Sequence, residues 1–297
     1  MNINNFKMFI KIVETRSISK ASEQMNISQS ALSQQLRVME QEFGANLLER
    51  SYNGVIPTDI GIILYNYALE ILSSFDRMSS DIINAKNQHK TIKILASPCA
   101  YSYALPCTFY HLKNNYPEYS LQVEVTSSNT IDEKMSKGQA DMGIIIGKPS
   151  SKNLSSKKVI SDRVFLVAGE KMNVPSKLEC QELYNYPLLM LNEAHKSRKI
   201  LDNMLKKIGI SINRLYIPYT LESTESIKLS VINGFGLAFL PYMAIKKEIY
   251  NKQIRIVEYP CAEFINEYYS IKNKNSENCS LSKLIKYIET ILKETIC

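Results

Sequence analysis

The sequence predicts an α-helical N-terminal part followed by an α/β part, and three observations support this division. Up to about residue 90 the apolar residues recur with helical spacing, whereas short apolar strands alternate with helical segments beyond it. The polar stretch 86–90 separates the two patterns. A chain of 297 residues also has room for about two domains of ordinary size.

The composition is that of a globular protein, with 45% hydrophobic and 22% charged residues. It excludes a disordered tail protein, a collagen-like repeat and a disulfide scaffold. No run of about 18 apolar residues is present, and the N-terminal segment lacks a small-residue cleavage site, so we expect neither a spanning helix nor a signal peptide. Six scattered cysteines in such a chain fit a reducing compartment, and we expect a cytoplasmic protein.

Enzymatic chemistry has no visible basis in the sequence. The six cysteines form no Cys-x-x-Cys pair and no cluster with histidine, and the three histidines lie far apart. No nucleophile–base pair or glycine-rich phosphate loop is visible. We therefore expect no catalytic residue, no metal site and no cofactor, and conclude that the protein is not an enzyme.

Three short helices are predicted at the N-terminus. In the first, apolar residues fall at i, i+3, i+4 and i+7, namely Phe6, Phe9, Ile10 and Val13. Ser19 is expected to cap the second helix. Ser28 should cap the third, which ends at Phe43 before Gly44. The buried stripe of the third helix should consist of Leu32, Leu36, Met39 and Phe43.

A hairpin with an Asn53-Gly54 turn follows the helices, and Pro57 ends it. Three helices and a hairpin form the outline of a winged helix-turn-helix, which we assign to residues 1–58. A long helix over 59–87 then begins after Thr58, a favourable N-cap. Its apolar residues recur with a near-heptad spacing that requires a partner helix, so we expect dimerisation through Leu64, Tyr67, Ile71, Phe75, Met78 and Ile82.

A hinge at 88–90 leads to a second domain over 91–297. Strands and helices alternate there, which predicts an α/β fold with mostly parallel sheets. About 200 residues are many for one lobe, and the pattern breaks near 161–163. We therefore expect two lobes, with the first over 91–162 and 267–297 and the second over 163–266.

The third helix carries the sharpest functional signal. Ser30, Ser33, Gln34 and Arg37 lie at i, i+3, i+4 and i+7, opposite the predicted buried stripe. Gln pairs with adenine, Arg with guanine and Ser with either base, so this face suits a major groove, although a merely solvated face has the same spacing. The net charge of +7 adds little, because residues 1–60 hold as many acidic as basic side chains.

At these residues the sequence resembles the LysR-type transcriptional regulators. The resemblance is carried by SISKASEQMNISQSALSQQLRVMEQEFGANLLERSYNGVIPTDIG, and it continues through IKILASPCAYSYALP, NTIDEKMSKGQADMGI, YPLLMLNEAHKSRKIL and LESTESIKLSVINGFGLAFLP. It implies a linker helix that pairs between subunits, a two-lobed domain similar to periplasmic binding proteins, and a homodimer or homotetramer. The protein should therefore bind double-stranded DNA and a small-molecule effector, and no membrane.

The resemblance also assigns candidate site residues. Those expected at DNA are Gln29, Ser30, Ser33, Gln34, Arg37, Arg50 and Asn53. Gln34 stands where the family commonly has arginine, and the wing lacks the family's usual basic residue, so base preference and phosphate affinity should depart from the family's norm. Those expected in an effector pocket between the lobes are Ser97, Cys99, Ser102, Ser128, Asn129, Ser197, Arg198 and Thr224.

The pocket residues suit a small anion, because hydroxyls and helix N-termini converge from separate loops. Each Ser or Thr could instead be a plain helix cap, and Arg198 a surface salt bridge rather than an anion clamp. Cys99 is either a redox switch, since a helix N-terminus lowers the pKa of a thiol, or a small residue in the pocket wall.

A regulator gated by a small anionic effector is the leading hypothesis. A thiol-based redox-responsive regulator of the same fold and a solute-binding protein are the alternatives. The absent export signal and the DNA-binding helices count against the solute-binding protein.

Overall fold

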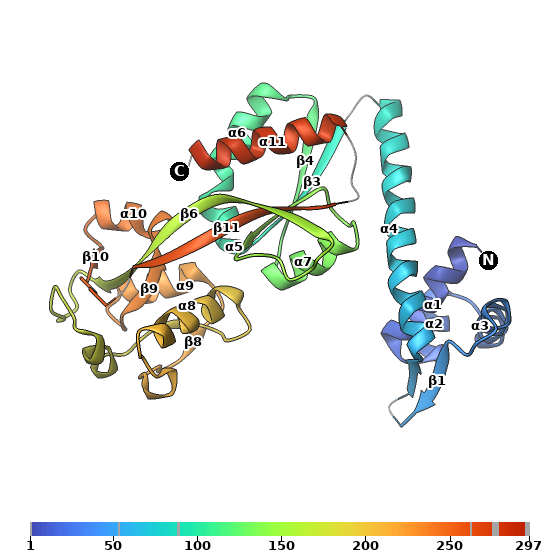
Figure 1. The fold of residues 1–297 in the computed structure, drawn as a ribbon, viewed down its shortest axis with the longest axis horizontal. Coiled ribbons are helices and arrows are strands. Elements are labelled where there is room, and N and C mark those ends of the chain that lie inside the picture. The colour runs from blue at the N-terminus through green and yellow to red at the C-terminus, as the bar shows by residue number, and fades with distance from the viewer. Residues whose placement is uncertain (1, 53, 88–89, 262, 275–278, 295–297) are drawn as a thin grey trace. The chain divides into compact units, whose positions relative to one another are not determined.

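The computed structural model describes the whole chain except residues 1, 53, 88–89, 262, 275–278 and 295–297. The chain divides near residue 88 into an N-terminal and a C-terminal compact unit (Figure 1). Among the described helices, none is long and apolar enough to cross a membrane.

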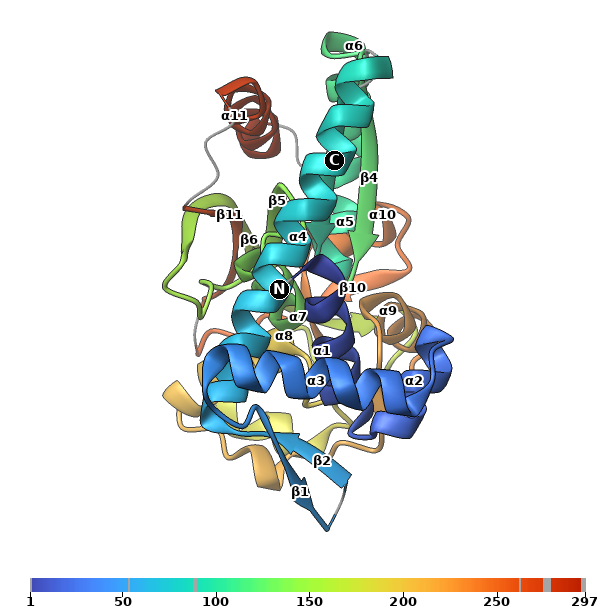
Figure 2. The ribbon, with the colours of Figure 1, turned by 90° about the vertical axis from the view of Figure 1, so that its right-hand side faces the viewer.

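The N-terminal unit is a winged helix-turn-helix followed by a long helix. Its elements, in chain order, are α1 (Ile3–Thr15), α2 (Ile18–Met25), α3 (Gln29–Phe43), β1 (Leu48–Ser51), β2 (Gly54–Pro57) and α4 (Asp59–Asn87). The three short helices and the hairpin gather around the first part of α4 (Figure 2). Their core contains fully buried side chains from α1 and α3, among them Met8, Phe9, Ile12, Leu32 and Met39.

Capping at the helix ends confirms most of the predicted boundaries. The Ser28 hydroxyl accepts a hydrogen bond from the Ala31 amide at 3.2 Å, and Gly44 ends α3 in the left-handed conformation. The Thr58 hydroxyl accepts from the Gly61 amide at 3.0 Å at the start of α4. A Cβ on Gly61 would lie 2.0 Å from the Leu47 carbonyl oxygen, so only glycine permits α4 to approach the hairpin this closely.

Two predictions for these helices are wrong. Ser17, not Ser19, caps α2, because Ser17 has the extended backbone of an N-cap and accepts from the Lys20 amide, whereas Ser19 lies inside the first turn. Phe43 is 44% exposed rather than buried. The chain turns at Gly44, and Leu47 enters the core in its place.

The two parts of the long helix α4 lie in different environments. Leu64 is predicted to pair with another subunit, but it is only 8% exposed and belongs to the core of its own unit, because α4 packs along α1 at this level. The apolar residues farther along are exposed, and they are Tyr67, Ile71, Phe75, Met78 and Ile82. The predicted apolar seam therefore begins after Leu64.

The C-terminal unit is built on one sheet with short flanking pieces. Its elements are β3 (Lys90–Ala96), α5 (Pro98–Tyr103), α6 (Leu105–Asn115), β4 (Tyr119–Val125), α7 (Ser128–Ser136), β5 (Met142–Ile146), β6 (Leu154–Gly169), β7 (Met190–Leu191), α8 (Lys196–Lys207), β8 (Thr220–Leu221), α9 (Thr224–Ile232), β9 (Ala238–Pro241), α10 (Tyr242–Tyr250), β10 (Ile254–Ile256), β11 (Phe264–Asn273) and α11 (Cys279–Glu294), with short 3₁₀ helices at Cys180–Asn185 and Ile212–Arg214.

The sheet is mixed, so the prediction of mostly parallel sheets is wrong. Its order is β10-β6-β11-β5-β3-β4, with β9 also on β6. Among the described strands of this sheet, the only parallel pairings are those of β3 with β4 and β5, whereas β11 is antiparallel to both β5 and β6. The reason is non-local, because the late strand β11 inserts between two earlier strands and runs against both.

Two lobes share the long strands β6 and β11. The core of the first lobe contains Ile92, Ile144 and Ile160, and the core of the second contains Leu166 and Phe264. The predicted break near 161–163 lies inside β6, which runs without interruption from one core to the other. The strand therefore joins the lobes and does not end between them.

Three further elements differ from the sequence predictions. Lys90 begins β3, so it is not part of a hinge, and the other two hinge residues lie outside the described part of the chain. The helix predicted up to Asn115 is divided at Ala104, because Pro106 in the first turn of α6 has no amide to continue α5. The helix α10 and the strand β10 are additional elements.

A charge in the apolar seam of α4 is expected to dissociate the subunits. Ile71 is 39% exposed within the single chain, and Ile71→Asp would place an unpaired carboxylate in a desolvated helix–helix contact. Analytical ultracentrifugation should show the variant as a monomer at concentrations where the wild type is a dimer or tetramer. Asp76→Asn, at another exposed position of α4, is the matched control, and an unchanged oligomer for Ile71→Asp would contradict the assignment.

Candidate DNA-reading helix and effector cleft

The outer face of α3 presents most of the predicted DNA-binding side chains to solvent. Gln29, Ser30, Gln34 and Arg37 are exposed and Ser33 is half-buried, while Leu32, Leu36 and Met39 point into the core. Two of the polar groups have local partners: the Ser19 hydroxyl donates to the Gln29 amide oxygen at 3.1 Å, and the hydroxyls of Ser28 and Ser30 lie 3.1 Å apart. The face is therefore polar, exposed and ordered by the cap of its own helix.

The hairpin forms the wing beside this helix. Arg50, a predicted DNA-binding residue, is exposed on β1, whereas Asn53 lies outside the described residues. Gly54 has a φ of +108°, and a Cβ there would lie 2.3 Å from the Arg16 carbonyl oxygen, which accepts from the Val55 amide. Tyr52 is fully exposed, and sequence reasoning did not single it out. The sequence signal that could have identified Tyr52 is an aromatic residue directly before an Asn-Gly turn.

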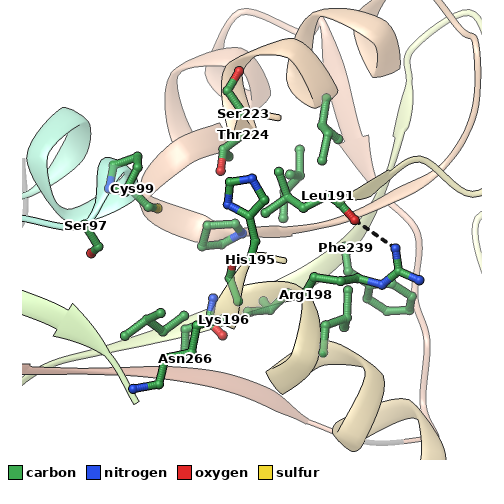
Figure 3. A pocket seen from close by; sticks show the side chains of 18 of the residues that line it. Ser97, Cys99, Leu191, His195, Lys196, Arg198, Ser223, Thr224, Phe239 and Asn266 are labelled. Carbon is green, nitrogen blue, oxygen red and sulfur yellow. Dashed lines mark hydrogen bonds between the residues drawn. The ribbon is translucent and has the colours of Figure 1, made fainter. Parts of the chain in front are cut away.

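A cleft of about 980 Å³, measured out to its open mouth, lies between the lobes of the C-terminal unit. Six of the predicted pocket residues line it: Ser97, Cys99, Ser128, Ser197, Arg198 and Thr224. Figure 3 shows Ser97 and Cys99 from the first lobe facing Thr224 and His195 from the second.

Two predicted pocket residues do not line the cleft. Ser102 and Asn129 are exposed and lie away from it. Ser102 is on the outer face of α5, five positions after Ser97. Asn129 follows Ser128 directly in α7, and because consecutive helical residues point about 100° apart, its side chain turns away from the cleft that Ser128 lines.

The helix caps fall one residue earlier than the cleft hydroxyls. Ser127 caps α7 and Ser223 caps α9, each accepting from an amide in the first turn. Ser128 and Thr224 are therefore not caps and lie in the cleft wall. The Ser128 hydroxyl accepts from the Ile146 amide at 3.3 Å, which leaves its proton available for donation.

Ser97 carries the most unusual hydroxyl in the cleft. The residue stands at the N-cap of α5, yet its side chain makes no capping hydrogen bond. It is 4% exposed, and its Oγ has no hydrogen-bond partner among the described residues. A buried hydroxyl without a partner costs about 1–3 kcal/mol. Such a group stabilises the protein only when something in the cleft bonds to it.

Arg198 lines the cleft but is buried, so the predicted alternative of a surface salt bridge is wrong. It is 2% exposed, its Nε lies 2.8 Å from an Asp202 oxygen, and its Nη1 donates to the Leu191 carbonyl at 2.8 Å. Figure 3 shows the guanidinium directed to Leu191. Arg198 therefore anchors α8 to β7 as a buried structural pair, and the i, i+4 spacing of Arg198 and Asp202 was the signal for it.

Several polar cleft residues were not predicted from the sequence, among them Lys196, His195 and Asn266. Lys196 begins α8, and its ammonium donates to the Lys148 carbonyl at 2.8 Å. Burial lowers the pKa of Lys196, and the nearby Asp132 carboxylate offsets part of this effect. The His195 ring lies 3.0 Å from a Glu222 oxygen, and Asn266 also belongs to the polar lining. Lys196 directly precedes a predicted cleft residue, so it could have been found.

Most of the remaining cleft wall is apolar. Its hydrophobic side chains include Ile146, Val164, Leu189, Leu191, Leu201, Met204, Ile227, Phe239 and Leu240. The cleft therefore combines hydroxyl and ammonium donors with a hydrophobic body, as small-molecule sites commonly do.

The thiol of Cys99 is not activated. Burial raises its pKa to about 12, although a hydrogen bond with Tyr268 acts in the opposite direction. The prediction that a helix N-terminus lowers this pKa is wrong, because desolvation outweighs the weak dipole of the six-residue helix α5. Cys99 therefore fits the pocket-wall alternative.

A buried carboxyl group stands behind the cleft at the start of α10. Burial raises the pKa of Asp162 from 3.8 to about 6, even though the Met243 amide donates to its two oxygens at 3.3 and 3.4 Å. Because the pKa is higher in the folded state, the folded chain holds this proton more tightly. Its contribution to stability is full below the unfolded-state pKa and is lost as the pH rises through about 6.

Replacing this carboxyl group is expected to change the pH dependence of stability. Asp162→Asn keeps a hydrogen-bond acceptor for Met243 and removes the titration. When the pH rises from 5 to 7, the free energy of unfolding of the wild type should therefore fall by about 1 kcal/mol relative to that of the variant. Urea titrations at both pH values measure this difference. Parallel pH profiles for the two proteins would contradict the raised pKa.

Comparisons with known proteins agree with this architecture. Residues 3–62 match the family model described as bacterial regulatory helix-turn-helix protein of the lysR family, and residues 85–290 match the LysR substrate-binding domain. The chain is 28% identical to the HTH-type transcriptional regulator CysL of Bacillus subtilis, over 97% of this chain and 91% of that protein. It is 29% identical to a probable RuBisCO transcriptional regulator of Cyanidioschyzon merolae, over 92% of each.

Solved structures share the fold. The LysR-family regulator CbnR matches with a TM-score of 0.68 and 15% identity, over 99% of this chain and all of that one. A hydrogen-peroxide-bound mutant of Corynebacterium glutamicum OxyR matches with a TM-score of 0.62 and 20% identity, over 99% of this chain and 92% of that one. The family models cover both units, and the resemblance found in the sequence is confirmed. The chain belongs to the LysR family of DNA-binding transcriptional regulators, with a helix-turn-helix in front of a substrate-binding domain.

Proposed function

We propose that this regulator binds DNA with the outer face of α3 and responds to a small organic anion held in the cleft between its lobes. One observation carries the second half of the proposal. The unpartnered hydroxyl of Ser97 lines the same cleft as the Lys196 ammonium. A carboxylate ligand would accept a hydrogen bond from the Ser97 hydroxyl and would place a negative charge beside the Lys196 ammonium.

The DNA-reading half rests on side-chain chemistry and exposure. Gln34 and Arg37 are exposed one turn apart on α3, which is the spacing of neighbouring base contacts on a helix in a major groove. An amide bonds adenine and a guanidinium bonds guanine at two points each. Arg50 on the wing adds a phosphate contact. Because residues 1–60 carry no net charge, affinity should depend on these specific contacts more than on bulk attraction.

The anion half rests on the balance of polar groups in the cleft. Glu222 is the only carboxylate among the described lining residues, and His195 lies against it. The donor groups in the lining that a ligand can use include the hydroxyls of Ser97, Ser128, Ser197 and Thr224 and the ammonium of Lys196. The apolar wall opposite favours an anion with a hydrocarbon body over inorganic phosphate or sulfate.

Response to the ligand follows from contacts that cross the cleft. Lys196 of the second lobe donates to Lys148 of the first, and on the other side Tyr103 of the first lobe donates to Glu225 of the second. A ligand that competes for Lys196 changes the relative stability of the lobe arrangements, and by linkage the ligand and the DNA then affect each other's affinity. A protein that performs this task binds DNA in the cytoplasm.

Alanine at the two α3 residues is expected to weaken specific DNA binding. Gln34→Ala and Arg37→Ala should each cost about 1–3 kcal/mol on a site selected from random DNA, with a smaller loss on unselected DNA. Fluorescence anisotropy with both DNAs measures this difference, and Asn4→Ala, an exposed amide on α1, is the control. Equal losses on both DNAs would reassign the residues to phosphate contacts, and no loss on either would refute their placement.

Removing cleft donors is expected to weaken the binding of an organic acid. A thermal-shift screen of small carboxylates identifies a binder, and calorimetry should then show roughly tenfold or greater weakening for Lys196→Gln and for Ser97→Ala. Ser102→Ala is the matched control, because Ser102 is on the same helix as the Ser97 cap but outside the cleft. Unchanged affinity in both cleft variants would place the site elsewhere.

A further inference from the structure

We infer that Cys180 and Cys261 form a reversible redox pair that responds to low-molecular-weight disulfides and acts on the rear wall of the cleft. The sulfur atoms of these residues are joined in the structure, and their Cα atoms lie 5.9 Å apart. That separation is within the range of unstrained disulfides. The residues are 81 positions apart in the sequence, so the fold itself brings them together.

The position of the pair fits exchange with small reagents. Cys180 is the first residue of a 3₁₀ helix, and Cys261 lies in the turn between β10 and β11. Both are half-buried, so part of each side chain is accessible to reagents in solvent. Oxidation therefore requires no unfolding of the second lobe.

The chemistry balances as two successive exchanges. One protein thiolate attacks the small disulfide, which forms a mixed disulfide and releases one small thiol. The second protein thiolate attacks the protein sulfur of the mixed disulfide and releases the other small thiol. The two cysteines lose two electrons and two protons, and the small disulfide is reduced to two thiols. Excess small thiol reverses both steps.

A chain of contacts connects this pair to the cleft. Tyr259 lies two residues before Cys261, and its hydroxyl donates to the Cys180 carbonyl at 3.3 Å. The Tyr259 ring packs on Phe239 with ring centroids 5.6 Å apart. Phe239 lines the effector cleft, and it also lines a second hollow that Tyr259 and Phe264 border. The disulfide therefore restrains the residue that supports this part of the cleft wall.

Redox titration of the full-length protein tests the first part of the inference. The protein is equilibrated with glutathione at stepped ratios of oxidised to reduced form, its free thiols are alkylated, and its peptides are identified by mass spectrometry. Cys180 and Cys261 should change together from alkylated to bridged, with both end states reached. A pair that stays reduced at the highest ratio, or stays bridged at the lowest, would overturn the inference.

Matched variants separate this pair from the other thiols. In Cys180→Ser, Cys261 should be found either alkylated or as a mixed disulfide with glutathione, and never bridged within the protein, because only the second exchange step is lost. Cys261→Ser should give the same result for Cys180. Cys99→Ser should leave the titration of the pair unchanged. A bridge from Cys261 to another cysteine in the Cys180→Ser variant would show that the specific pairing is wrong.

Hydrogen exchange tests the connection to the cleft and needs no effector. In the oxidised wild type, amides over 257–261 and 237–240 should exchange roughly tenfold more slowly than in the reduced protein. The Cys180→Ser variant should show no such difference under the same two conditions. Equal exchange over 237–240 in the oxidised and reduced wild type would overturn the coupling, even if the disulfide forms.

Discussion

The antiparallel pairing of β6 with β11 is the constraint on which the C-terminal unit depends. β11 pairs with β6 from Phe264 opposite Val164 to Asn273 opposite Leu154, and this ladder runs through the cores of both lobes. Every cleft residue is placed relative to this ladder. Val164 and Asn266 come from the two strands themselves, and the helices that present the hydroxyls begin on either side of them. A one-residue slip would exchange the faces of β11 and remove Tyr268 from the first core.

Local signals in the sequence predicted the elements that depend on local physics. Ser28 and Gly44 mark the ends of α3 because a cap needs only its own helix. The same reasoning placed the cap of α2 at Ser19 instead of Ser17, because either serine near the start of this helix is a favourable N-cap in the sequence pattern. Phe43 continues the helical spacing of the apolar residues in α3, so it was predicted to be buried. The spacing alone does not show at which residue the core ends.

Features that depend on distant partners could not be predicted in this way. The insertion of β11 between β5 and β6 joins segments more than a hundred residues apart, and so does the contact of Tyr103 with Glu225. The family resemblance predicted that Ser97, Ser128 and Thr224 would line the cleft, and they do. It could not show that Arg198 is held by Asp202 and Leu191, or that the half-buried Lys196 also lines the cleft. Burial decides such roles, and burial is a property of the assembled fold.

The division of α4 between a core and a seam has a consequence for how the family's architecture tolerates change. Ala68 is buried in the core of the winged helix, and Ile71 is exposed one turn later on the same continuous helix. The number of residues between the winged helix-turn-helix and the apolar seam of α4 therefore fixes the direction in which the seam faces relative to the winged helix-turn-helix. A single inserted residue would turn the seam by about 100° relative to the winged helix-turn-helix, whereas an insertion of about seven would nearly restore this direction and add about 10 Å of reach. Insertions or deletions in α4 should therefore preserve function only when they add or remove about seven residues at a time.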